Sequence, residues 1–271
     1  MTKTFKSKLD FAKFLAMEAG KLARDQYRRK DDEFISVKGL QDFVTTADRQ
    51  VEELIRALIS QYYPTDAVLG EEDGNTGHGD ALWVVDPIDG TANFMRGLPD
   101  WAVSIAYCEN GNIELGVIYA ADRDELCWAR KGQGAFCNDQ PLHVSDCSRP
   151  DQALLLLGRS SRGPLQNYLD IIRLTIAAKM EYRRNGSAAI SLMSVAQGRA
   201  EGYYEAHLNA WDALAGILII REAGGLVHAK SVPETLKNGS GIVAVTPMLE
   251  RVVLEVTGTD PDITTEAEVM T

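Results

Sequence analysis

Acidic residues gather at four points of the 271-residue chain, each where an apolar segment ends or a helical pattern begins. At one of them Asp86 and Asp89 stand three residues apart, directly after the apolar run 82–85, and Pro87 and Gly90 shape the turn. Two carboxylates at the end of a buried strand are costly to remove from water unless a partner neutralises them. A hard cation with oxygen ligands is the most economical partner, so this segment predicts a metal site.

The other three acidic points have simple structural explanations when each is taken alone. Glu71 follows a short apolar run and suits a solvated turn, whereas Asp48 and Asp212 each begin a helical pattern and suit a helix cap. Their combination is what indicates chemistry. Enough oxygen ligands for two divalent ions come from Glu71, Asp86, Asp89 and Asp212. The remaining carboxylate, Asp48, can orient a hydroxyl such as that of Thr91.

Apolar periodicity indicates the elements that must position these residues. Helices are expected over residues 7–23, 46–62, 168–178, 188–197, 211–223 and 247–256. Strands are expected over residues 67–69, 82–85, 103–108, 113–119, 126–129, 134–137, 154–157, 202–204 and 241–245. The segment 29–41 favours a surface loop or a short hairpin. Two helices, a β-meander and then alternating helices and strands predict layered sheets and helices with a seam near residues 145–152.

The composition argues against several classes of protein. Asp plus Glu number 39 against 28 Lys plus Arg, a formal net charge of −11, so direct nucleic-acid binding is not expected. No apolar stretch approaches the roughly 20 residues that a bilayer requires. The N-terminus has no apolar signal core, and a cytoplasmic protein is therefore expected. No C-x-x-C pair occurs, so reduced, mostly buried thiols are expected for Cys108, Cys127, Cys137 and Cys147.

Histidine and serine chemistry is not favoured by the spacing of those residues. The histidines do not cluster: His207 lies near Asp212 in sequence, and surface or loop positions are expected for His78, His143 and His228. Ser160 and Ser161 lie in Gly-Arg-Ser-Ser-Arg-Gly, which has neither the nucleophile-elbow nor the P-loop spacing. A polar loop after a strand is the expected structure there.

Five motifs, in order along the chain, resemble those of the inositol monophosphatase family, within the lithium-sensitive, magnesium-dependent phosphatases that include fructose-1,6-bisphosphatases. The motifs are Asp42-Phe43-Val44-Thr45-Thr46-Ala47-Asp48, Gly70-Glu71-Glu72, Asp86-Pro87-Ile88-Asp89-Gly90-Thr91, Lys131-Gly132-Gln133-Gly134-Ala135-Phe136 and Trp211-Asp212-Ala213-Leu214-Ala215-Gly216. The resemblance runs from about Leu9 to Val245. It implies an α+β or α/β fold, namely a layered αβαβα sandwich, together with Mg²⁺ dependence and a homodimer.

The resemblance also implies roles for particular residues. Ligands of two to three Mg²⁺ ions would be Glu71, Asp86, the main-chain oxygen of Ile88, Asp89 and Asp212. The attacking water would be oriented by Glu71, Thr91 and Asp48. Substrate contacts would come from Asp89, Gly90, Thr91, Gly186, Ser187, Ala188, Glu205 and Asp212. Lys38 lies in the loop that, in this family, often reaches the metal site.

The reaction implied is hydrolysis of a phosphate monoester by a metal-activated water, inhibited by Li⁺ and without a covalent phosphoenzyme. Inositol 1-phosphate, a small phosphorylated polyol, is the expected substrate, because the Glu205 carboxylate can accept hydrogen bonds from ring hydroxyls. Histidinol phosphate and 3′(2′),5′-bisphosphate nucleotides are alternatives on the same scaffold. A non-catalytic regulatory partner role is an alternative of another class.

Two halves and a tail are expected along the chain. Residues 1–147 hold the β-meander and most metal ligands, residues 148–258 hold the substrate-contacting segment, and 259–271 form an acidic tail expected to fray. The homodimer expectation rests on the resemblance and on the stretch 94–101, whose aromatic residues include Phe94 and Trp101. That stretch is expected to pack at the subunit interface.

Overall fold

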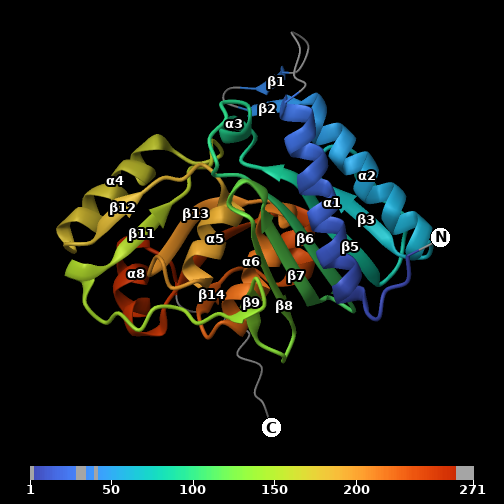
Figure 1. The fold of residues 1–271 in the computed structure, drawn as a ribbon. Coiled ribbons are helices and arrows are strands. Elements are labelled where there is room, and N and C mark those ends of the chain that lie inside the picture. Colours follow the sequence, from blue (N-terminus) through green and yellow to red (C-terminus); the bar gives the residue numbers. More distant parts are fainter. Residues whose placement is uncertain (1–2, 29–34, 40–41, 261–271) are drawn as a thin grey trace.

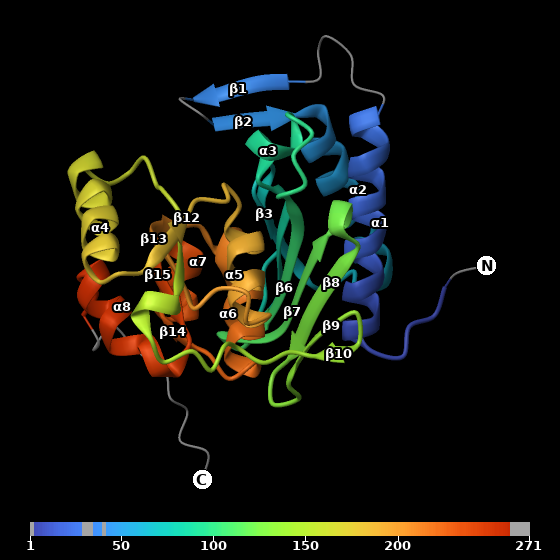
Figure 2. The same cartoon turned by 60° about the vertical axis from the view of Figure 1, so that its left-hand side comes forward.

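Five layers make up the fold, in the order helices, sheet, helices, sheet, helices (Figures 1 and 2). The computed structural model describes the backbone of residues 3–28, 35–39 and 42–260 and the side chains of residues 3–28 and 45–260. An outer layer of α1 (Lys8–Arg28) and α2 (Thr46–Tyr62) covers one face of a large sheet. The expected αβαβα sandwich is therefore confirmed.

The large sheet follows the order β10-β9-β8-β7-β6-β5-β3-β4. Its strands are β3 (Ala67–Gly70), β4 (Gly74–Thr76), β5 (Ala81–Asp89), β6 (Ala102–Glu109), β7 (Asn112–Ala120), β8 (Glu125–Arg130), β9 (Ala135–Cys137) and β10 (Gln140–Pro141). Neighbours are antiparallel except β3 and β5, which are parallel. A two-residue turn joins β6 to β7, and its Asn110 and Gly111 have φ of 51° and 77°, as a tight hairpin requires.

The smaller sheet follows the order β12-β11-β13-β15-β14. Its strands are β11 (Leu154–Leu157), β12 (Glu181–Arg183), β13 (Gly202–Leu208), β14 (Leu226–His228) and β15 (Ser240–Val245). The outermost layer, α4 (Leu165–Ala177) and α8 (Glu250–Thr257), covers its far face (Figure 2). The remaining elements are the hairpin β1 (Ile35–Gly39) and β2 (Asp42–Thr45), the short α3 (Thr91–Phe94), and α7 (Val232–Asn238) between β14 and β15. Short 3-10 helices span Ala121–Arg123, Pro150–Gln152 and Pro247–Leu249.

The middle layer consists of α5 (Ala188–Ala196) and α6 (Ala210–Glu222), packed between the two sheets. Every residue of α5 is buried, which is the pattern expected of a helix that is apolar on all sides. Small residues let α6 lie directly on the large sheet: a β-carbon at Gly116 of β7 would stand 2.5 Å from the carbonyl oxygen of Ala215. The N-termini of both helices lie near the end of β5, since Ala189 of α5 contacts Asp89 and Asp212 of α6 lies close to Asp86 and Asp89.

Most expected helices and strands are present, with differences that matter for the site. The strand expected over residues 82–85 continues through Asp89, and β4, β10, β12, β14 and α7 were not expected. His228 was expected in a loop or on the surface, and this is wrong: it lies in β14, is 2% exposed and contacts Glu250. The segment 29–41 was expected to be a surface loop or a short hairpin. Its residues 35–39 form β1, which pairs with β2 just after the segment, and residues 29–34 and 40–41 lie outside the described residues.

Two further expectations concern membranes and thiols. Among the described residues, no helix is both long enough and apolar enough to cross a bilayer. All four cysteines are free; Cys108 and Cys127 are buried, and Cys137 and Cys147 are partly buried. Of the tail expected over residues 259–271, the part 261–271 lies outside the described residues.

Candidate metal and substrate site

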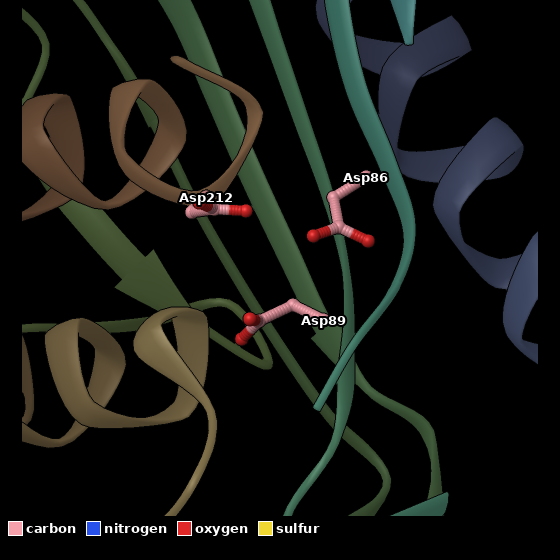
Figure 3. A group of neighbouring side chains, drawn as sticks. All are labelled: Asp86, Asp89 and Asp212. Atoms are coloured by element: carbon pink, nitrogen blue, oxygen red, sulfur yellow. The ribbon is translucent and has the colours of Figure 1, made fainter. Parts of the chain in front are cut away.

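The end of β5 brings two carboxylates to the same side of the large sheet. In a regular strand, residues three apart point to opposite faces. Here the register with β6 is irregular between Asp86 and Asp89, where Pro87 has no N–H to give to the ladder, and the backbone N–H of Ile88 donates to Asp86 Oδ1 at 2.9 Å. The irregularity turns both side chains toward one space (Figure 3).

A third carboxylate comes from the first turn of α6. Asp212 accepts a hydrogen bond from the backbone N–H of Asn209 at 2.9 Å and so completes a capping box at the start of that helix. One oxygen each from Asp86, Asp89 and Asp212 lie within 4.8 Å of one another (Figure 3). The Asp212 side chain therefore does two things at once: it caps α6 and it lies beside the two carboxylates of β5.

The charge of this cluster is not balanced by basic side chains within it. Asp86 is 1% exposed, and burial, followed by the charges of Glu71, Asp89 and Asp212, raises its pKa well above the ordinary value. Burial and the charge of Asp89 raise the pKa of Asp212 to about 7. Clustered carboxylates that suppress one another's ionisation, with only oxygen donors, suit a hard divalent cation such as Mg²⁺. The donor set therefore fits the expected metal.

Asp48 links the start of α2 to the start of α3, two residues after the end of β5. One of its carboxylate oxygens accepts from the backbone N–H of Thr45 at 2.8 Å, and the other lies 3.2 Å from the Thr91 hydroxyl. That hydroxyl is also 3.1 Å from the carbonyl oxygen of Ile88. Asp48 is 1% exposed, and burial raises its pKa to about 6. It is thus both the capping residue that the sequence suggested and the partner of Thr91.

Glu71 lies in the turn between β3 and β4, next to the end of β5. It is partly buried, and among neighbouring charges it has the largest effect on the pKa of Asp86. It is not one of the three carboxylates whose oxygens lie within 4.8 Å of one another. The structure therefore places Glu71 beside Asp86, at the edge of the cluster.

Asp89 also holds the N-terminus of α5, a segment about a hundred residues away in the chain. Its carboxylate accepts hydrogen bonds from the Ser187 hydroxyl, from the N–H of Ala188 at 3.3 Å and from the N–H of Ala189 at 2.7 Å. These bonds lower the pKa of Asp89 but do not outweigh burial, which raises it. The expected segment 186–188 is thereby brought to the metal cluster.

Two glycines with positive φ shape the backbone around this contact. Gly90 has a φ of 93°, and a β-carbon there would stand 2.8 Å from the carbonyl oxygen of Asp100. Gly186 has a φ of 79°, and its missing β-carbon leaves room for the side-chain amide of Asn93, which donates to the carbonyls of Asp100 and Asn185. A side chain at either glycine would strain the turn that carries Thr91 or Ser187.

A cavity of about 310 Å³ opens beside the cluster, and its walls include Asp89, Ser187, Ala188, Glu205 and Asp212. Glu205 of β13 accepts a hydrogen bond from the Tyr203 hydroxyl at 2.6 Å. Burial raises the pKa of Glu205 to about 7. The structure thus places Glu205 and the 186–188 segment in one cavity with two of the clustered aspartates.

Some cavity residues had no signal in the sequence. Arg159 and Arg184 line the cavity from two different loops, and in the part of the chain that the structure describes neither guanidinium has a hydrogen-bond partner. The charge of Arg184 lowers the pKa of Glu205 against the effect of burial. Both arginines lie far in sequence from any metal motif, so only the fold brings them to the site. Tyr203 lies two residues before Glu205, on the same strand.

Other expected residues lie away from the cluster or outside the described side chains. The backbone of Lys38 belongs to β1, and its side chain is outside the described residues. Ser160 and Ser161 lie in an exposed or partly exposed loop, as expected. His207 contacts Arg162 and does not line the cavity.

The aromatic residues expected at a subunit interface are buried inside the chain. Phe94 and Trp101 are 2% and 1% exposed, and their rings pack edge to face at 4.9 Å. Phe94 also packs against Tyr27 of α1. The two rings belong to the core under α1, whereas residues 96–99 between them are exposed, with Leu98 at 46%. The expectation that the stretch 94–101 packs at a subunit interface stays a prediction.

Comparisons with known proteins agree with the geometry. A model of the inositol monophosphatase family matches residues 6–258. An inositol-1-monophosphatase of Mesorhizobium japonicum is 38% identical over 89% of this chain and 92% of its own length. A Nus factor SuhB of Pasteurella multocida is 37% identical over 91% and 94%. The crystal structure of the extragenic suppressor protein suhB from Bartonella henselae is 36% identical, covers 91% of this chain and 96% of its own, and superposes with a TM-score of 0.85.

Proposed function

The chain belongs to the inositol monophosphatase family, and we propose that it is a Mg²⁺-dependent hydrolase of phosphate monoesters. The observation that supports this most directly is the cluster of Asp86, Asp89 and Asp212 beside an open cavity. A buried cluster of this kind opposes folding unless a cation compensates it. An opening beside it gives a phosphate group access to that cation.

The proposed metal ligands are Glu71, Asp86, the Ile88 carbonyl oxygen, Asp89 and Asp212, which together would hold two to three Mg²⁺ ions. Bound Mg²⁺ would neutralise phosphate oxygens, lower the pKa of a water molecule and stabilise the leaving alkoxide. The irregular end of β5 supplies three of these ligands, so their spacing is set by the backbone. The remaining two come from the β3–β4 turn and from α6.

The protein's own groups would position the attacking water. Asp48 and the Ile88 carbonyl fix the Thr91 hydroxyl from two sides, at 3.2 and 3.1 Å. A hydroxyl fixed in this way, together with the Glu71 carboxylate, can hold a water in line with a phosphate group in the cavity. Catalysis would then consist of positioning and charge stabilisation, with no covalent bond between enzyme and phosphate.

We propose inositol 1-phosphate as the substrate. Asp89, Gly90, Thr91, the segment 186–188, Glu205 and Asp212 are the proposed contacts, and the cavity that most of them line suits a small phosphorylated polyol. A partly ionised Glu205 can accept hydrogen bonds from ring hydroxyls. The same carboxylate could pair with the ammonium group of histidinol phosphate, and Arg159 and Arg184 could face the second phosphate of a bisphosphate nucleotide, so both stay as alternatives.

The test is hydrolysis of a panel of phosphate esters by the purified protein. Inositol 1-phosphate, histidinol phosphate, adenosine 3′,5′-bisphosphate and glycerol 2-phosphate would be compared with Mg²⁺, with EDTA, and with Mg²⁺ plus Li⁺. We expect EDTA to abolish turnover, Mg²⁺ to restore it and Li⁺ to inhibit it. Asp89→Asn should lower kcat and kcat/KM together, since the lost charge acts mainly in the transition state. Full activity in EDTA would refute the metal-dependent mechanism.

A second candidate function is a regulatory one. It is supported by relatives of 36–40% identity that are named Nus factor SuhB. Hydrolysis and such a role could reside in one protein. In a strain that lacks this gene, a copy with Asp89→Asn should restore growth if the strain needs the regulatory role. It should fail to restore growth if the strain needs catalysis.

We also propose a homodimer, which the family supports. Phe94 and Trp101 are buried, so any contact made by the stretch 94–101 would come from its exposed residues 96–99. The division at residue 147 likewise stays a proposal. It is supported by the composition of the sheets: every strand of the large sheet precedes that residue and every strand of the smaller sheet follows it.

A further inference from the structure

One face of α2 presents three charged residues at intervals of four, namely Asp48, Glu52 and Arg56. Residues spaced by four lie above one another on the same side of a helix. Asp48 contacts Thr91, as described above. Glu52 and Arg56, one and two turns further along, contact the β3–β4 turn instead.

Glu52 lies beneath the backbone of the turn that carries Glu71. Its side chain is fully buried, and its two carboxylate oxygens accept hydrogen bonds from the backbone N–H groups of Glu72 at 2.9 Å and Asp73 at 3.0 Å. The turn rests directly on this carboxylate: a β-carbon at Gly70 would stand 2.3 Å from Glu52 Oε1. The residues on both sides of Glu71 are thereby held against α2.

Arg56 neutralises Glu52 and fastens the strands on either side of the turn. Its Nε donates to Glu52 Oε1 at 2.8 Å, and the second ion-pair contact is 2.7 Å. The remaining guanidinium hydrogens reach the carbonyl of Val68 in β3, and the carbonyl of Gly74 and the hydroxyl of Thr76 in β4. A buried carboxylate with these partners is fully hydrogen-bonded, so it is rigid.

From these contacts we infer that Glu52 and Arg56 are positioning residues for Glu71, and this inference rests on the proposed function. A turn between two short strands can be satisfied by water and needs no buried ion pair beneath it. Here one rigid helix fixes the Thr91 hydroxyl through Asp48 and, through Glu52, the backbone of Glu72 and Asp73 that follows Glu71. The two groups proposed to orient the attacking water are thus held at a constant separation by α2, even though they belong to different segments of the chain.

The test measures binding of Mg²⁺ alone, by isothermal titration calorimetry of the metal-free protein, for wild type, Glu52→Gln, Arg56→Lys and a control, Glu53→Gln. Glu53 is the neighbouring glutamate on α2, and its side chain is exposed. Glu52→Gln removes the charge and places an amide against a backbone donor. Residues that orient metal ligands typically contribute about 10- to 100-fold to metal affinity, and we expect Glu52→Gln to weaken Mg²⁺ binding by such a factor.

The kinetic counterpart separates positioning from folding. Glu52→Gln should need more Mg²⁺ for half-maximal activity but recover much of its kcat at saturating Mg²⁺, with an unchanged KM for the phosphate ester. Arg56→Lys keeps the positive charge and loses the donors to β4, so the Mg²⁺ concentration that it needs for half-maximal activity should lie between those of wild type and Glu52→Gln. If Glu52→Gln fails to fold, Arg56→Lys alone still tests the inference. Glu53→Gln should match wild type.

Two results would count against the inference, and they are distinguishable. Wild-type Mg²⁺ affinity in Glu52→Gln and Arg56→Lys, with only a lower melting temperature, would show that the pair supports the fold and not Glu71. Absence of Mg²⁺ binding and of phosphatase activity in the wild-type protein itself would overturn the proposed function and the inference together.

Discussion

Replacement of one proposed metal ligand should make the metal-free protein more stable. Burial raises the pKa of Asp212 from the ordinary 3.8 to about 7, so the folded state resists ionisation of this carboxylate. Each pH unit of such a change corresponds to about 1.4 kcal/mol, so keeping Asp212 ionised in the folded state at pH 8 costs up to about 4 kcal/mol. Asp212→Asn removes that cost and keeps an oxygen that can accept from the Asn209 N–H.

The pH dependence of this gain has a definite sign. The folded-state pKa of Asp212 is raised, so the stability contribution of the neutral group is complete below pH 4 and is lost as the pH rises through about 7. The advantage of Asp212→Asn over wild type in EDTA should therefore be small at pH 4 and largest at pH 8. Addition of Mg²⁺ at pH 8 should reverse or narrow the difference, because only the wild type regains the full ligand set.

Urea unfolding of both proteins in EDTA at several pH values measures the difference in the free energy of unfolding. Asp170→Asn, on α4 with a side chain 46% exposed, is the matched control and should show little dependence on pH. A difference between wild type and Asp212→Asn that is the same at pH 5 and pH 8 would refute the electrostatic reasoning. So would a less stable Asp212→Asn at pH 8 without metal.

Three other predictions concern the cavity and the assembly. Glu205→Gln should raise KM for inositol 1-phosphate much more than for glycerol 2-phosphate, and steady-state kinetics that show an equal loss for both esters would contradict a contact with ring hydroxyls. Gly158→Ala would place a carbon 1.9 Å from Glu205 Oε2 and should reproduce that selective rise, whereas Gly163→Ala, with open space around it, should not. Light scattering across a concentration series should give the dimer mass, and a constant monomer mass would contradict the proposed homodimer.

The sequence is informative where structure and chemistry depend on neighbouring residues. The segment 86–91 combines an apolar strand, two carboxylates and a glycine turn within a few residues, and the structure places it at the carboxylate cluster. The capping box of Thr45 and Asp48 is also a local pattern and lies where it was expected. A local error that touches the site is the end of β5, which continues through Asp89, because a proline inside a strand suggested an earlier end.

Contacts between distant segments could not be predicted in the same way. The bonds from Ser187 and Ala189 to Asp89 join residues about a hundred positions apart, and the ion pair of Glu52 and Arg56 resembles an ordinary surface pair in the sequence. The burial of Phe94 is similar: an aromatic residue after a turn is compatible with a core or an interface. The structure shows that Phe94 belongs to the core, because Tyr27 of α1 packs over it.

The junction of Asp89 with α5 has a consequence for the folding kinetics. The β5 strand and the large sheet can form from contacts between neighbouring hairpins, but the carboxylate cluster exists only after α5 and α6 have docked between the two sheets. Contacts of such long sequence separation form late, since the entropy of closing the loop must be overcome first. Metal affinity should therefore appear during refolding after most of the secondary structure, which makes the ion a stabiliser of the native state and not a nucleus for folding.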